Sequence, residues 1–158
     1  MISPDLLINT KNWTRIIRSW KNGKLPHALL FHGPSGSGKE GHALELAALI
    51  NCTAPQKEGP CGSCPSCKKT KSFQHENVTL ILPLPRGKII SRDDPVTKAF
   101  SDSVLKEYLE MLKQKEEDPY YSIRLPGANT ILINSIRDLK HDASLSTVNN
   151  EWRAVLIF

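Results

Sequence analysis

The stretch Leu29-Leu30-Phe31-His32-Gly33-Pro34-Ser35-Gly36-Ser37-Gly38-Lys39-Glu40 determines the fold that we predict for this chain. An apolar run from Ala28 to Phe31 leads into a glycine-rich loop, and a helical pattern follows from Lys39 to Ile50. An apolar run this short, bounded by turn residues, is typical of a buried parallel strand. A strand, a tight loop and a helix in this order predict an α/β layered domain.

The loop matches the pattern G-x-x-x-x-G-K, which holds phosphate groups in nucleotide-binding α/β proteins. Its glycines let successive backbone N–H groups point into one concavity, and the dipole of the following helix attracts an anion. Lys39 would reach the terminal phosphates as a point charge. The alternative is a glycine-rich turn without a ligand. The expected phosphate-binding residues are Gly33, Pro34, Ser35, Gly36, Ser37, Gly38, Lys39 and Glu40.

Glu40 departs from this pattern. The residue after the lysine is normally Ser or Thr, whose hydroxyl coordinates Mg²⁺ beside the phosphates. A carboxylate at that position adds repulsion next to a triphosphate and lacks the geometry of a neutral hydroxyl. Because catalysis of phosphoryl transfer depends on positioning and charge neutralisation, we expect no ATP hydrolysis by this chain alone. We predict no catalytic residue.

The four cysteines of the chain, Cys52, Cys61, Cys64 and Cys67, follow the predicted helix with the spacing C-x8-C-x2-C-x2-C. Glycines and prolines between them favour tight turns that aim the thiolates inward. Four thiolates at this spacing predict a tetrahedral Zn²⁺ site with a structural rather than catalytic role. Disulfides are disfavoured in a cytosolic chain, and four independent free thiols would not cluster so closely.

Length and composition describe an ordinary soluble domain. The chain has 158 residues, 39% hydrophobic and 23% charged, which allows one domain with its own core. No apolar run approaches the roughly 20 residues that cross a bilayer, and the N-terminus lacks a signal-peptide pattern, so a cytoplasmic location without a membrane partner is expected. The net charge of +5 permits contact with nucleic acid, but it is equally typical of a solvated helix face.

Hydrophobic periodicity predicts the remaining elements. Trp13, Ile16, Ile17 and Trp20 share one face of a helix over residues 9–22. Strands are predicted over Val78 to Leu82 and Ala154 to Phe158, and helices over a region containing Val104 to Leu112 and from Asn134 or Ser135 onward.

Together, the loop and the four-cysteine insertion resemble the N-terminal part of bacterial clamp-loader subunits of the AAA+ family. The sequence is most similar to the delta-prime type of DNA polymerase III and is related to the gamma/tau type. The segments that carry the resemblance are His27 to Pro34, Gly33 to Lys39, the four cysteines, Ile133 to Arg137, and Val155 to Phe158. It covers most of the chain except roughly residues 84–127.

The resemblance implies an AAA+ phosphate-loop sheet flanked by helices. Residues 1–158 would be the N-terminal part of that domain, with a zinc-binding insertion at 52–67 and a polar, helical insertion at about 84–127. The acidic metal motif, the sensor and the arginine finger would lie after Phe158. It also implies a role in DNA replication, with gamma/tau and delta subunits as partners and with the sliding clamp and primed DNA contacted through the complex.

Three functions remain open at this point. The resemblance implies a stator first, because delta-prime members often have altered phosphate loops, which agrees with Glu40. A gamma/tau-like ATPase is the first alternative. The second is a zinc-dependent nucleic-acid-binding module, in which Lys68, Lys69 and Lys71 would contact phosphates.

Overall fold

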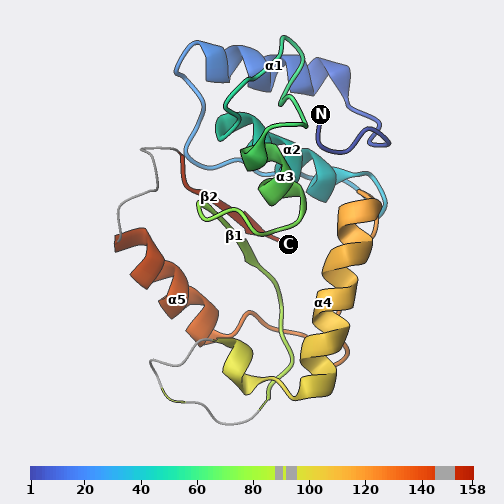
Figure 1. The fold of residues 1–158 in the computed structure, drawn as a ribbon, viewed down its shortest axis with the longest axis vertical. Coiled ribbons are helices and arrows are strands. Elements are labelled where there is room, and N and C mark those ends of the chain that lie inside the picture. Colours follow the sequence, from blue (N-terminus) through green and yellow to red (C-terminus); the bar gives the residue numbers. More distant parts are fainter. Residues whose placement is uncertain (88–90, 92–95, 145–151) are drawn as a thin grey trace.

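The structure is a computed structural model that describes residues 1–87, 91, 96–144 and 152–158. Helices surround a central pair of strands, so the α/β class is confirmed (Figure 1). Within the described residues, no helix has the length and apolar character needed to cross a membrane. The elements are α1 (Thr10–Lys21), α2 (Lys39–Ile50), α3 (Pro65–Lys71), β1 (Val78–Ile81), the 3-10 helix η1 (Val96–Ala99), α4 (Asp102–Glu117), α5 (Ile133–Ser144) and β2 (Ala154–Ile157).

The two strands form a parallel pair at the centre of the molecule. Their register runs from Val78 opposite Ala154 to Ile81 opposite Ile157, so both predicted strands are confirmed. Parallel strands need a long crossover connection, and here it contains η1, α4 and α5. One core joins the strand pair to α2, the four-cysteine segment and the N-terminus, and its buried residues are Ile2, Leu44, Ala47, Ala48, Cys67, Val78 and Leu156.

Helix α1 crosses α2 and is the helix that the hydrophobic spacing predicted. The side chain of Asn9 caps it by accepting a hydrogen bond from the Asn12 N–H, 3.2 Å away. Trp13 and Ile17 are buried against Leu46 and Leu49 of α2. The packing of α1 therefore fixes the orientation of the helix that follows the glycine-rich loop.

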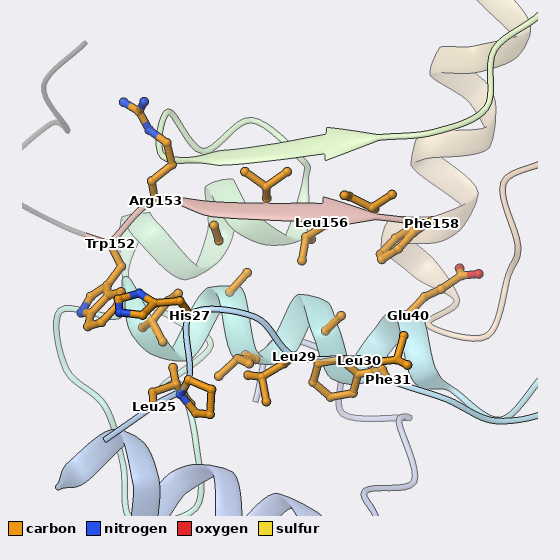
Figure 2. Close-up of a pocket in the computed structure, with 18 of the residues that line it drawn as sticks. Leu25, His27, Leu29, Leu30, Phe31, Glu40, Trp152, Arg153, Leu156 and Phe158 are labelled. Atoms are coloured by element: carbon orange, nitrogen blue, oxygen red, sulfur yellow. The ribbon is translucent and has the colours of Figure 1, made fainter. Parts of the chain in front are cut away.

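The prediction of a buried strand at Ala28–Phe31 is wrong for this structure. These residues form no regular element, and Leu30 is 90% exposed. A cavity of about 390 Å³ separates the segment from β2, with Leu29, Phe31 and Leu156 among its lining (Figure 2). An apolar run becomes a strand only when a neighbour pairs with its backbone, and within the described ranges β2 pairs with β1 alone.

Helix α4 is longer than its apolar spacing indicated. The Ser101 hydroxyl caps its start by accepting from the Val104 N–H, and the helix continues through the mostly charged residues 113–117, ending two residues before Pro119. Together with Leu82, Leu84 and Leu125, Phe100 just before α4 forms a separate core. Within the predicted insertion at about 84–127, residues 88–90 and 92–95 lie outside the described residues.

Glu45 is a fully buried carboxylate on α2 that holds the N-terminal residues. Its Oε1 accepts from the Ser3 N–H at 2.7 Å, and its Oε2 accepts from the Ile2 N–H at 3.2 Å. Burial raises the pKa of Glu45 above its ordinary value of 4.5, and the two N–H donors only partly offset that rise. Compared with the unfolded chain, the fold therefore shifts the protonation equilibrium of Glu45 toward its neutral form.

We expect Glu45 to make the chain less stable as pH rises. Its protonated form contributes stability that is fully present below pH 4.5 and is lost as pH rises through the raised pKa. Urea unfolding is measured from pH 5 to 8 for the natural protein and for Glu45→Gln. The free energy of unfolding of the natural protein should fall with rising pH relative to that of Glu45→Gln. If the two free energies change with pH in the same way, the pKa of Glu45 is not raised.

Candidate functional site

The glycine-rich loop, residues 33–38, sits directly before α2 and needs its glycines. Gly36 and Gly38 adopt left-handed backbone angles, with φ of 75° and 72°, and Gly38 is the N-cap of α2. A Cβ on Gly38 would lie 2.8 Å from Leu6 Cδ1 and 3.0 Å from Tyr120 Cε1. The loop is therefore held between the N-terminal segment and the segment after α4.

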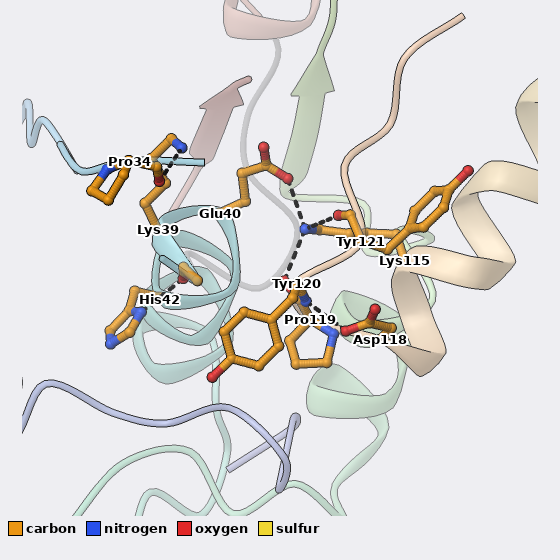
Figure 3. Close-up of polar contacts among 10 residues, drawn as sticks. Pro34, Lys39, Glu40, His42, Lys115, Asp118, Pro119, Tyr120 and Tyr121 are labelled. Carbon is orange, nitrogen blue, oxygen red and sulfur yellow. Dashed lines mark hydrogen bonds and ion pairs between the residues drawn. The ribbon is translucent and has the colours of Figure 1, made fainter. Parts of the chain in front are cut away.

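Lys39 begins α2 and folds back over the loop. Its Nζ donates to the Pro34 carbonyl oxygen at 3.2 Å, a contact in an exposed position (Figure 3). This hydrogen bond closes the loop without a ligand. Because the contact is exposed and the Lys39 ammonium makes no other hydrogen bond within the described part of the chain, a side-chain rotation would release it toward an incoming anion.

Glu40 points the other way, toward α4, and forms an ion pair with a buried lysine (Figure 3). Its Oε2 lies 2.7 Å from Lys115 Nζ, and the Lys115 side chain is 1% exposed. Lys115 also donates to the carbonyl oxygens of Pro119, at 2.9 Å, and Tyr121, at 2.5 Å. A lysine ammonium has three protons, so all three have acceptors here.

A second cavity, of about 690 Å³, opens between the loop and the segment that follows α4. Its charged lining consists of three cations and one anion, Lys39, Lys115, Arg124 and Glu40, which leaves a net charge of +2. Loop residues Ser35, Gly36 and Gly38 line one side, and Tyr120, Ser122 and Asn129 add polar groups to the wall. The predicted phosphate loop thus faces an electropositive cavity.

The four predicted metal ligands come together. Their four Sγ atoms all lie within 4.8 Å of one another, and the Cys52–Cys64 and Cys61–Cys67 sulfur pairs are each 3.9 Å apart. Tetrahedral zinc with Zn–S bonds of about 2.3 Å requires sulfurs about 3.8 Å apart. The two 3.9 Å pairs match this value, and the 4.8 Å limit on the whole cluster is compatible with a single metal ion.

Backbone N–H groups donate hydrogen bonds to sulfurs of the cluster, and such bonds stabilise the thiolate form. The N–H of Cys61 donates to Cys52 Sγ at 3.3 Å, that of Cys64 to Cys61 Sγ at 3.3 Å, and that of Cys67 to Cys64 Sγ at 3.4 Å. The Cys64 N–H, helped by Ser63, lowers the pKa of Cys61 to about 5. Burial raises the pKa of Cys67. A bound cation would be needed to hold all four as thiolates.

His75 anchors this segment to the start of β1 and is not part of the sulfur cluster. Its Nε2 donates to Ser66 Oγ at 2.9 Å, because the Ser66 hydroxyl already donates to the Asn51 carbonyl. Its Nδ1 accepts from the Asn77 N–H at 3.1 Å. These partners assign the imidazole its Nε2–H tautomer, so both ring nitrogens are engaged by the protein.

The family model described as "DNA polymerase III, delta subunit" matches residues 8–158. The chain belongs to this family. The DNA polymerase III subunit delta' of Bacillus subtilis is 32% identical over 98 residues, which is 60% of this chain and 30% of that protein. That of Pseudomonas aeruginosa is 27% identical over 141 residues, 88% of this chain and 42% of that protein.

A DNA polymerase III subunit gamma/tau, from Mycobacterium bovis, is 47% identical over 45 residues, 28% of this chain and 8% of that protein. No solved structure matches the chain. The chain therefore spans less than half the length of the delta' relatives that it matches.

Sequence reasoning missed Lys115 in this member of the delta-subunit family. It lies in a run of charged residues that ordinarily indicates a solvated helix end, and no local pattern marks it as buried. The lysines considered for nucleic-acid contact, Lys68, Lys69 and Lys71, lie on α3, where Lys69 pairs with Glu76. They are placed apart from the electropositive cavity and do not line it.

Proposed function

We propose that this chain is the phosphate-loop part of a delta-prime-type clamp-loader subunit that acts in DNA replication without hydrolysing ATP. The carrying observation is the Glu40–Lys115 ion pair, at 2.7 Å. Glu40 occupies the position whose hydroxyl would coordinate Mg²⁺, and its carboxylate is already engaged by a cation of the protein itself. A loop that lacks its metal ligand can retain the shape of a motor subunit without its chemistry.

The wider proposal follows from the family. Residues 1–158 would form the N-terminal part of a cytoplasmic AAA+ domain, with insertions at 52–67 and about 84–127. Gamma/tau and delta subunits would be its partners, and it would contact the sliding clamp and primed DNA through that complex. Membership of the DNA polymerase III delta-subunit family supports this assignment.

The four cysteines would hold a structural Zn²⁺. The sulfur spacing and the backbone N–H donors support this assignment, and four thiolate ligands leave no open position on the metal for a substrate or water. When bound, the ion would supply cross-linking rather than catalysis. It would join the end of α2 to α3 through Cys52 and Cys67.

ATP turnover by the full-length subunit tests the central proposal. We expect the rate with Mg²⁺ to equal that of Lys39→Ala, because neither protein would position the metal. Lys113→Ala, which removes an exposed charge of α4 outside the cavity, controls for the loss of a lysine.

Turnover that disappears only in Lys39→Ala would replace the stator proposal with the gamma/tau-like ATPase. The 47% identity of a gamma/tau subunit over 45 residues makes that the second candidate. Copurification with gamma/tau and delta subunits tests the partners separately, and failure to enter that complex would contradict the clamp-loader assignment.

A further inference from the structure

We propose that Lys115 takes the place of a divalent cation beside the loop, so that the electropositive cavity binds a phosphate-bearing anion without Mg²⁺. This inference rests on the non-hydrolysing function proposed above and adds the ligand class of the same site. The inference has three requirements. The Lys115 ammonium must be held firmly beside Glu40, a divalent metal ion must be disfavoured at that position, and the cavity must still bind an anion.

The Lys115 ammonium is held in place because the protein surrounds it. Lys115 is 1% exposed, and its three protons go to Glu40, Pro119 and Tyr121. The Phe158 ring, whose centroid lies 5.9 Å from Nζ, covers it as well. The ammonium therefore has no free proton for a ligand, and it acts on the cavity only through its charge.

A divalent ion is disfavoured at the same place for two reasons. The Glu40 carboxylate already faces Lys115, so a metal would have to compete with the ammonium for it. A metal that approached without displacing Lys115 would meet a buried positive charge, and repulsion between like charges grows in a low-dielectric environment. Glu40 and Lys115 thus replace the hydroxyl and Mg²⁺ of an ordinary phosphate loop.

The cavity keeps its attraction for an anion after this exchange. Its charged lining, Lys39, Lys115, Arg124 and Glu40, sums to +2, and the Gly36 and Gly38 turns place backbone amides at the start of α2. Its volume of about 690 Å³ is within the usual range for a small-molecule pocket. Metal-free phosphate groups match this charge better than a phosphate group neutralised by Mg²⁺.

Calorimetric titration of the full-length protein with pyrophosphate and with ADP tests the inference. Each titration is run in buffer with Mg²⁺ and in buffer from which Mg²⁺ was removed by ion exchange before the protein was added, so that zinc stays bound. We expect binding constants that agree within about threefold between the two conditions. Binding of pyrophosphate as tight as ADP would identify the phosphates as the recognised group, and tighter ADP binding would add a nucleoside contact.

Substitutions show whether the charges that line the cavity determine anion binding. Arg124→Ala should weaken binding about tenfold in both conditions, whereas Lys113→Ala, outside the cavity, should leave it unchanged. The paired change Glu40→Thr with Lys115→Gln restores the hydroxyl and removes the ammonium, while the glutamine amide keeps two N–H donors at this position. A circular dichroism melt confirms its folding, and its pyrophosphate binding should become at least tenfold tighter in Mg²⁺.

Three results would overturn the inference. They are tighter binding by the natural protein in Mg²⁺ than in Mg²⁺-free buffer, no binding of either ligand at millimolar concentration, and Mg²⁺-independent binding by the folded double variant. None of them depends on ATP turnover. An inactive protein that binds no phosphate would therefore refute this inference and leave the stator proposal intact.

Discussion

Removal of the proposed zinc ion from the four cysteines should unfold the segment from Cys52 to Lys71 and lower the free energy of unfolding of the chain by more than about 4 kcal/mol. Structural zinc sites contribute roughly 10 kcal/mol or more to small modules, a value comparable with the whole stability of a domain. Cys67 is fully buried in the core that joins Ile2, α2 and both strands, so the loss would extend beyond the segment.

The measurement is urea unfolding of the purified protein before and after zinc chelation, together with metal analysis. We expect about one zinc ion per chain. Cys67→Ser should reproduce the effect of chelation, while Ser63→Ala, which keeps all four thiols and removes one exposed hydroxyl that donates to Cys61 Sγ at 3.7 Å, should change much less. No bound metal, four freely reactive thiols and unchanged stability would together refute the zinc assignment.

Loss of the Glu40 carboxylate should be the second large effect. Glu40→Ala leaves Lys115, 1% exposed, without its counter-charge, and removal of one partner of such a pair costs about 3 kcal/mol. Glu40→Gln should cost less, because the amide oxygen can still accept a hydrogen bond from Nζ. Equilibrium unfolding of these variants measures both values.

The exposed pair Lys69–Glu76 provides the matched control. Both of its side chains are 48% exposed, so solvent screens the attraction and Lys69→Met should barely change stability. If Glu40→Ala were as mild as Lys69→Met, Lys115 would not be held as the structure shows. That result would also remove the basis for treating Lys115 as a substitute for a metal.

Elements whose signal is local could be predicted from the sequence. The spacing of Trp13 and Ile17 indicated α1, the apolar runs at Val78 and Ala154 indicated both strands, and the cysteine spacing indicated the sulfur cluster. The residues that determine α1 and the two strands are close together in the chain. The cysteines are all thiols, and four thiols at this spacing allow few arrangements other than one cluster.

Features that depend on distant partners could not be predicted. Residues 28–31 have the composition of a strand, but strand formation also needs a pairing edge, which no local pattern encodes. The burial of Lys115 depends on Glu40, 75 residues away, and on two carbonyl oxygens whose positions follow from the turn after α4. Glu45 likewise is buried because the N-terminal residues fold back over it.

The cavity between residues 28–31 and β2 bears on how the chain behaves at high concentration. Leu30 is 90% exposed and Ile157 62% exposed, and the backbone of β2 on this side has no strand beside it among the described residues. Apolar side chains beside an unpaired strand edge invite other chains to add strands. We therefore expect concentrated solutions of this chain to scatter light, so dilute samples are the better material for quantitative work.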